Sequence, residues 1–348
     1  MNRWQSTQTL SYSGLSPVRS PGRFRYQLTI IVILLGILLT FLLSLSMGSV
    51  SLTLTELWQA FWHQGNTVNQ TIIWELRLPR VLAAFTVGAA LGTSGALLQG
   101  MLRNALATPF LLGISAGAGL VVVVLITLNV FLFLIPIAAW VGAILTTGLV
   151  YLLAKVGNEI QVERLILGGV AISSLFGAIQ TTLLLLSEDG RIQQALNWIV
   201  GSLNGRGWSD LTLSFPYIAI ALIGACLLSR SLNVLHLGDE LAVGLGMSLA
   251  RSRLLIGGTA TLLAASAVSI AGLIGFIGLL VPHGVRALLG NNDYRLLVPL
   301  SAVAGAMVLA LADLLSRLGA VELPVGAVTA LVGSPLFVWL LYRRTFTL

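Results

Sequence analysis

The segment WELRLPRVLAAFTVGAALGTSGALLQGMLRNALATPFLLGISAGAGL, residues 74–120, decides the class of fold. It begins with an Arg-x-x-Arg pair, Arg77 and Arg80, and continues into a glycine-rich apolar run. A short polar turn follows, and a second apolar run begins directly after Pro109. Because about 20 apolar residues cross the core of a bilayer as a helix, the segment predicts two membrane-spanning helices, 81–99 and 110–128.

The rest of the chain has the same character. Of its 348 residues, 57% are hydrophobic and only 9% are charged, whereas soluble domains carry about 25% charged residues. This composition excludes a soluble globular protein. Apolar runs between charges and turn residues predict an all-α polytopic membrane protein with about ten transmembrane helices, at 28–47, 81–99, 110–128, 131–153, 165–186, 211–229, 254–271, 273–287, 297–316 and 324–342. The eighth is expected to be short, because only the small-residue patch SIAGLIG separates it from the seventh.

The positive charges predict the orientation, because cytoplasmic loops accumulate Lys and Arg. With the N-terminus inside, fourteen of the nineteen Lys and Arg residues fall on the cytoplasmic side, and the outer side keeps Arg77, Arg80, Arg191, Arg206 and Arg317. Ten spans place both termini in the cytoplasm. We therefore expect a multi-pass protein of the inner (plasma) membrane. The net charge of +7 is spread over many loops, which does not indicate a nucleic-acid partner.

The ends of the first span carry two further expectations. Residues 1–27 are rich in Ser, Pro and Arg and are expected to form a flexible cytoplasmic tail, which leaves 28–348 as a single transmembrane domain. The run 28–47 is longer than the apolar core of a cleaved signal peptide, so we expect it to remain as the first span. Beyond it, Thr53 or Thr55 is placed to cap a short helix at the membrane interface.

Residue patterns typical of catalytic and metal sites are absent from the sequence. The single lysine, Lys155, stands between Ala154 and Val156, so the chain has no Gly-Lys-Ser/Thr loop for nucleotide phosphates. The three histidines lie in separate segments without an i, i+4 pair, and Cys226 is alone in an apolar run. We expect no metal, no cofactor, no disulfide and no catalytic residues, and we expect Cys226 to be a small core residue.

A buried acid would point to an ion-coupled carrier, because charge inside a bilayer is costly and is kept for function. The only acid well inside a predicted span is Asp313, about one turn from the outer end. Arg317 follows at i+4, so an ion pair at the helix end accounts for it. An ion-coupled secondary transporter therefore stays as an alternative of another class.

One amphipathic segment is too short to cross a bilayer. LNVLHLGDELAVGLGM, residues 232–247, lies in the predicted cytoplasmic loop 230–253 and contains the acid pair Asp239 and Glu240. Gly238 can end one short helix, Asp239 can cap the next and Gly244 can end it. Leu241 and Leu245 would then form an apolar face for a partner. A loop resting on the membrane surface is the alternative.

Small residues predict close packing between helices in the opening segment. Gly-x-x-x-Gly spacing lets two backbones approach each other in a membrane. The candidates for packing or for the lining of a pathway are Gly88, Gly92, Gly95, Gln99, Gly113, Ser115 and Gly117.

From about Trp74 to the C-terminus, the sequence resembles the permease subunits of FecCD-type ABC importers, which take up iron-siderophores, haem and cobalamin. The resemblance rests on RLPR, GALLQG, RNALATPFLLGISAGA, LGDELAVGLG, GFIGLLVPH, ALADLLSR and ELPVGAVTALVGSPLFVWLL, in that order. One departure is the inner turn, where relatives often read Asn-Pro-Leu and this chain has Asn104, Ala105 and Leu106. That change puts the rigidity of the turn in doubt.

The resemblance implies a type II ABC importer permease of ten helices. It implies a second permease copy or a paralogue with the pathway along the dimer interface, an ATPase dimer on the cytoplasmic face and an extracytoplasmic substrate-binding protein. By position, the ATPase-coupling residues would be Leu237, Gly238, Asp239, Glu240, Leu241, Ala242, Gly244, Leu245 and Gly246, with two short helices in the coupling loop. Acids of the binding protein would meet Arg77, Arg80 and Arg317. The leading substrate is an iron-siderophore, with cobalamin or haem as the alternative.

Overall fold

The computed structural model describes residues 23–48, 50–157, 159–319 and 321–343 of the chain. The helices are α1 Arg23–Ser46, α2 Leu54–Phe61, α3 Thr67–Thr71, α4 Leu78–Met101, α5 Ile114–Leu128, α6 Ile135–Ala154, α7 Val162–Leu185, α8 Asp189–Val200, α9 Trp208–His236, α10 Asp239–Gly244, α11 Leu249–Ala271, α12 Ile277–Leu289, α13 Tyr294–Ser316 and α14 Val325–Arg343. A π-helical turn η1, Ile72–Arg77, precedes α4, and short 3-10 turns η2, Pro109–Leu112, and η3, Leu132–Leu134, precede α5 and α6. Two antiparallel strands, β1 Lys155–Val156 and β2 Glu159–Ile160, form a hairpin between α6 and α7.

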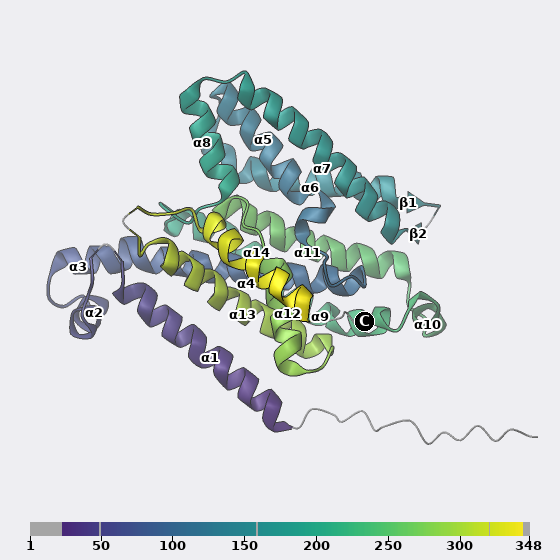
Figure 1. Ribbon diagram of the computed structural model, residues 1–348, viewed down its shortest axis with the longest axis horizontal. Helices are drawn as coiled ribbons and strands as arrows, with labels where there is room; N and C mark the ends of the chain where they lie inside the picture. The colour runs from purple at the N-terminus through teal and green to yellow at the C-terminus, as the bar shows by residue number, and fades with distance from the viewer. Residues whose placement is uncertain (1–22, 49, 158, 320, 344–348) are drawn as a thin grey trace, which may run out of the picture.

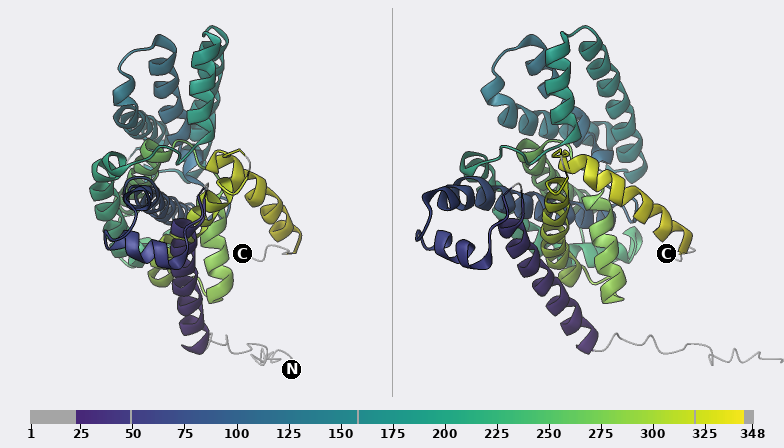
Figure 2. Two further views of the ribbon diagram at one scale, coloured as in Figure 1. Left: turned by 90° about the vertical axis from the view of Figure 1, so that its left-hand side faces the viewer. Right: turned by 60° about the vertical axis from the view of Figure 1, so that its left-hand side comes forward.

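The long helices lie side by side and give the molecule two ends (Figure 1). The end that carries α2 and α3 is called the α2 end, and the end that carries α10 and the hairpin is called the α10 end. Helices α5–α8 form an upper group, and α1 slants across the opposite edge (Figures 1 and 2). Helix α4 lies at the centre, in contact with α9, α11, α12 and α13.

Burial separates the central helices from the peripheral ones. In the most apolar 18-residue stretch of the span that contains α4, 78% of the residues are buried, whereas the corresponding fraction in α1 is 28%. Large apolar side chains such as Leu35 and Leu39 of α1 stay exposed. Because a membrane offers lipid rather than water to such side chains, α1 is placed at the lipid-facing edge of the bundle.

The prediction of a ten-helix membrane protein is confirmed. Among the described residues, seven helices are long and apolar enough to cross a membrane, and three shorter apolar helices, Ile114–Leu128, Ile277–Leu289 and Val325–Leu340, coincide with the remaining predicted spans. The eighth span is indeed short, with 13 residues in α12. The chain leaves helix between α11 and α12, where Gly272 has a φ of 71° and Phe276 a φ of 67°. Left-handed backbone at both positions ends the helical ladder and turns the chain.

The short helix in the first loop is capped by one of the two threonines that the sequence indicated. Thr53 caps α2: its side-chain oxygen accepts a hydrogen bond from the Glu56 backbone N–H at 3.3 Å, and the Glu56 carboxylate accepts one from the Thr53 backbone N–H at 2.8 Å. This reciprocal pair satisfies two backbone donors at the start of the helix. The bonds from Thr53 lower the pKa of the Glu56 carboxyl.

Several expectations differ from the structure. Helix α1 begins at Arg23, so residues 23–27 are helical, and the rest of the expected tail, 1–22, lies outside the described residues. Helix α8 and the β1–β2 hairpin were not predicted. Cys226 is exposed on α9 rather than a core residue, because its side of the helix faces away from the bundle.

Candidate functional site

An ionic cluster lies at the α2 end, where α4 begins and α13 ends. Arg80 donates from Nε and Nη2 to Asp313 Oδ1 at 3.0 and 2.8 Å, and its Nη2 also donates to Glu322. Arg317 Nη2 lies 3.1 Å from Asp313 Oδ2, as the i+4 spacing predicted. The Asp313 side chain is only 1% exposed. Two arginines from different elements therefore neutralise one buried carboxylate, while Glu322 sits at the open side of the cluster.

Arg77 lies near this cluster but makes different contacts. Its Nη1 donates to the backbone carbonyls of Leu45 at 2.6 Å and Ser46 at 3.1 Å, and its Nη2 donates to the carbonyl of Val50. These carbonyls belong to the end of α1 and the loop that follows it, where a helix leaves its last acceptors unpaired. Arg77 thus joins α1 to the start of α4, and only 6% of the residue is exposed.

The three predicted docking arginines, Arg77, Arg80 and Arg317, share one feature despite their different partners. All of them line a hollow of 530 Å³ at the α2 end. Glu75, Arg206 and Glu322 line the same hollow. The sequence placed three positive groups on one outer surface, and the structure brings them together within a recess rather than on a protruding face.

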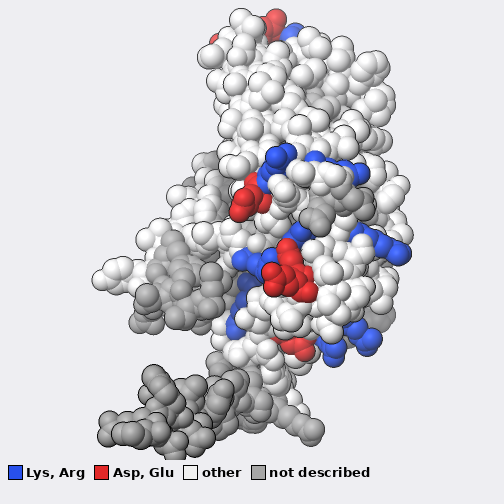
Figure 3. Space-filling view, turned by 90° about the vertical axis from the view of Figure 1, so that its right-hand side faces the viewer, with Lys and Arg blue, Asp and Glu red and all other residues white. Residues whose placement is uncertain are grey.

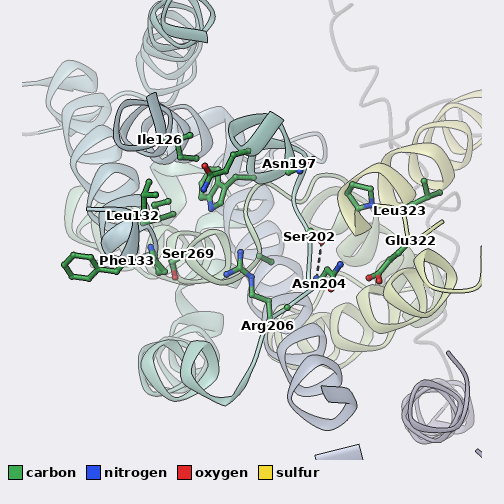
Figure 4. Close-up of a pocket in the computed structure, with 17 residues that line it drawn as sticks. Ile126, Leu132, Phe133, Asn197, Ser202, Asn204, Arg206, Ser269, Glu322 and Leu323 are labelled. Atoms are coloured by element: carbon green, nitrogen blue, oxygen red, sulfur yellow. Dashed lines mark hydrogen bonds between the residues drawn. The ribbon is translucent and has the colours of Figure 1, made fainter. Parts of the chain in front are cut away.

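A larger cavity of 790 Å³ adjoins this hollow and shares Asn204, Gly205, Arg206 and Glu322 with it. Figure 4 shows apolar Leu132 and Phe133 on one side of the cavity, Glu322 and Leu323 on the other side, and Arg206 between them. The wall is built from the end of α5, from η3 with the start of α6, from α8 with the loop that follows it, from the end of α11 and from the segment before α14. The sequence offered no direct signal for this cavity, because its residues are brought together from five separate segments.

The glycines of α4 allow it to touch two neighbouring helices. A Cβ added at Gly88 would overlap the carbonyl of Gly305 in α13, and one added at Gly95 would overlap the carbonyl of Gly278 in α12. Gly92 faces the carbonyl of Ser301 in the same way. All three are buried within the chain.

The remaining packing candidates also lie inside the bundle. Gln99 donates from Nε2 to the carbonyls of Gly278 and Leu279 at 3.2 and 3.3 Å, and its Oε1 accepts a hydrogen bond from Arg286. Gly113, with a φ of 75°, ends η2 and allows α5 to begin. Gly117 packs against Thr146 and Gly142 of α6. Within the described part of the chain, the buried hydroxyl of Ser115 has no hydrogen-bond partner.

At the opposite end, the predicted coupling segment forms one short helix instead of two. Helix α9 runs without a break to His236, and α10 follows over Asp239–Gly244. Gly238, with a φ of 111°, is the N-cap of α10, so Asp239 is the first helical residue and not the cap. Figure 3 looks at this end and shows basic side chains around a few acidic ones.

Helix α10 turns its large apolar side chains away from the bundle. The exposed fractions are 61% for Leu241, 55% for Val243 and 67% for Leu245, and Leu237 just before the helix is 57% exposed. Ala242 is its buried residue, and Gly244 and Gly246 are exposed as well. The apolar face predicted from Leu241 and Leu245 therefore exists and is uncovered in this chain.

The two acids of the segment have different surroundings. Asp239 Oδ1 accepts from Arg103 Nη2 at 2.9 Å, and its Oδ2 accepts from Arg253 Nη2 at 2.7 Å. Glu240 is exposed, and no ion pair is recorded for it among the described residues. The sequence could not separate these neighbours, because the arginines that pair with Asp239 lie 136 and 14 residues away.

Comparisons with known proteins agree with this arrangement. The FecCD transport family model matches residues 34–343. A cobalamin import system permease protein, BtuC of Halobacterium salinarum, is 40% identical over 79% of this chain and 74% of its own length. An iron(3+)-hydroxamate import system permease protein, FhuG of Bacillus subtilis, is 37% identical over 90% of this chain and 96% of its own.

The fold has a close counterpart among solved structures. A metal-chelate type ABC transporter in an inward-facing conformation superimposes with a TM-score of 0.84 and 31% identity, covering 92% of this chain and 100% of the other. The resemblance found in the sequence is thereby confirmed over nearly the whole chain. This chain is a polytopic membrane permease and belongs to the FecCD transport family.

Proposed function

We propose that the chain is the transmembrane permease subunit of a binding-protein-dependent ABC importer in the inner membrane, and that it carries an iron-siderophore or a related metal chelate. Cobalamin and haem are the alternatives within the family. Support for a metal chelate comes from the relatives, whose names include cobalamin and iron(3+)-hydroxamate permeases. The pathway is proposed to run along the interface with a second permease copy or a paralogue.

The observation that carries this proposal is the exposed apolar face of α10. Leu241 projects from a six-residue helix that is too short to cross a membrane, and Leu245 follows at i+4 on the same side, just past the end of the helix. This helix lies at the end where Arg103, Lys155, Arg164, Arg230, Arg251, Arg253, Arg286 and Arg295 gather, which the positive-inside rule assigns to the cytoplasm. Apolar surface in water favours a protein partner. The chain has no phosphate-binding loop, so we propose an ATPase subunit as that partner.

The binding protein is proposed to dock at the α2 end. Arg80 and Arg317 line a recess, and Arg80 shares its guanidinium with Glu322, whose side chain is 35% exposed. Because Arg80 already binds Asp313 and Glu322, a carboxylate of the binding protein would take the place of Glu322 at Arg80 Nη2 and form a charge-assisted hydrogen bond there. Arg77 supports the site by holding α1 against α4.

An ion-coupled carrier is less well supported. Such a carrier needs an acid that binds and releases an ion during transport. Asp313, the acid inside a span, is 1% exposed and paired with both Arg80 and Arg317. In the part of the chain that the structure describes, His, Cys, Asp and Glu side chains form no group of three or more that could hold a metal ion.

The partner assignment is tested by co-expression of the chain with its candidate ATPase subunit and co-purification of the two. The amount of ATPase that co-purifies with the double variant Leu241→Asp/Leu245→Asp should be lower by a factor of about ten or more, because a charge at both positions removes the apolar contact. The matched control is Val68→Asp, which places a charge on a 60% exposed apolar residue of α3 at the other end. Equal retention by the double variant and the control would refute α10 as the contact.

A further inference from the structure

Within this proposed function, we infer that Asp239 is a positioning residue that couples the motion of α10 to the transmembrane bundle, whereas Glu240 faces the partner. Both acids lie in the first turn of α10. Only Asp239 is tied to other elements of the fold. The two neighbouring acids therefore have different roles, although they are adjacent in the sequence.

The first link runs to the centre of the bundle. Arg103, which follows the end of α4, donates to Asp239 Oδ1 at 2.9 Å. Its φ of 48° lies in the left-handed region that non-glycine residues seldom adopt. Asn104 stabilises the same turn, because its Oδ1 accepts the Leu106 backbone N–H at 2.9 Å. This turn presents Arg103 to α10.

The second link runs to α11 and the hairpin. Arg253 of α11 donates from Nη2 to Asp239 Oδ2 at 2.7 Å and from Nη1 to the carbonyl of Ile160 at 3.0 Å. The Arg253 side chain is 7% exposed, so the arginine lies mostly out of solvent, whereas the Asp239 side chain is 36% exposed. The Tyr151 hydroxyl of α6 donates to the Arg253 carbonyl at 3.4 Å. One carboxylate thus joins α10 to α4, α11 and the strand that leads into α7.

The other contacts of α10 are too few to replace these links. Its one buried residue is Ala242, and its leucines face outward. Gly238 adopts a φ of 111°, which a side chain would strain. When a partner pulls or turns α10, the load passes through the backbone joints to α9 and α11 and also through the charged hydrogen bonds of Asp239. These bonds are stronger than neutral ones, and they add a direct link to the turn after α4 and to α11.

Hydrogen exchange tests the mechanical part without any ligand. In the full chain in lipid nanodiscs, Asp239→Asn should raise exchange at the amides of 239–246 and 103–107 at least about fivefold, because two charge-assisted bonds are weakened. Asp239→Glu keeps the carboxylate and should restore most of the protection. The control Glu188→Gln alters an exposed ion pair at the other end, Glu188 with Arg191, and should leave these amides unchanged.

The coupling part is tested in proteoliposomes that hold the chain, its ATPase and the binding protein. Asp239→Asn should keep ATPase retention within about twofold of wild type. The stimulation of ATP hydrolysis by the binding protein should fall at least about fivefold, because weakened charge-assisted bonds transmit less of the motion between α10 and the bundle. If Asp239→Asn misfolds, Arg103→Gln removes only the more exposed partner and should show a smaller loss of the same kind.

Three results separate the explanations. Unchanged exchange and unchanged stimulation in Asp239→Asn would overturn the inference. A fall in ATPase retention that matches the fall in stimulation would make Asp239 a docking residue and would also overturn it. Absence of the ATPase from the wild-type chain would instead refute the proposed function, and the exchange experiment would still decide the contacts of Asp239.

Discussion

At the scale of single residues, the acid buried inside a predicted span is compensated by two arginines. Asp313 lies inside the end of a span, 1% exposed, between Arg80 and Arg317. The pairing with Arg317 follows from i, i+4 spacing, so the sequence could predict it. The pairing with Arg80 joins residues 233 positions apart, and no local pattern reveals such a contact.

Replacing Asp313 should destabilise the protein strongly. Asp313→Asn leaves two arginines without their shared counter-charge, and removal of one partner from a buried ion pair costs about 3–5 kcal/mol. We expect a lower thermal unfolding midpoint in detergent, measured by the fluorescence of the native tryptophans. Glu188→Gln, which breaks a pair whose acid is 77% exposed, should change stability by less than about 1 kcal/mol. Equal shifts of the unfolding midpoint in the two variants would show that the buried cluster contributes no more to stability than the exposed ion pair.

At the scale of elements, the length of the apolar runs and the positions of the charges predicted the spans. They did not predict which spans pack against each other. The ten predicted runs match helices because a membrane span needs a long uninterrupted apolar sequence. Helix α8 was missed because it is short and amphipathic, with Ala195 and Trp198 buried at i, i+3 spacing. The hairpin was missed because two residues per strand give no alternation to read. The glycines of α4 were recognised as packing candidates, although the helices they touch were not.

Gly95 provides the sharpest test of helix packing. Gly95→Ala should destabilise the fold by about 1–3 kcal/mol, because the added methyl group overlaps the carbonyl of Gly278 and the backbones must separate. Gly258→Ala in α11 is the matched control, since nothing lies within 4 Å of the added Cβ. There the helix propensity of alanine should stabilise by up to about 1 kcal/mol. Thermal unfolding of the two variants should shift in opposite directions, and a shift in the same direction would argue against close contact of α4 and α12.

At the scale of the whole molecule, the two ends of the chain carry different features. The α2 end holds a recess lined by arginines and a cavity of 790 Å³. The α10 end holds the uncovered apolar helix. The proposed direction of the chain across the membrane rests on the distribution of Lys and Arg. That distribution carries no information on the substrate, and similar permeases carry names for different chelates.

Cysteine labelling tests the orientation. In a Cys226→Ser background, Leu241→Cys at the α10 end should react with a membrane-impermeant maleimide only after the cells are opened. Val68→Cys at the α2 end should react in spheroplasts without opening. Both side chains are well exposed, at 61% and 60%, so access to the reagent depends on the side of the membrane. The reverse pattern would invert the assignment of the two ends.

The central claim is that this chain imports a metal chelate by using ATP hydrolysed by a separate subunit. It is tested most directly by uptake into proteoliposomes that contain the chain with its ATPase, with the binding protein outside and ATP inside, offered ferric hydroxamate, haem and cobalamin in turn. The account predicts that at least one chelate accumulates, and only when both the ATPase and ATP are present. Transport of a chelate by the chain alone, driven by a proton or sodium gradient, would contradict it.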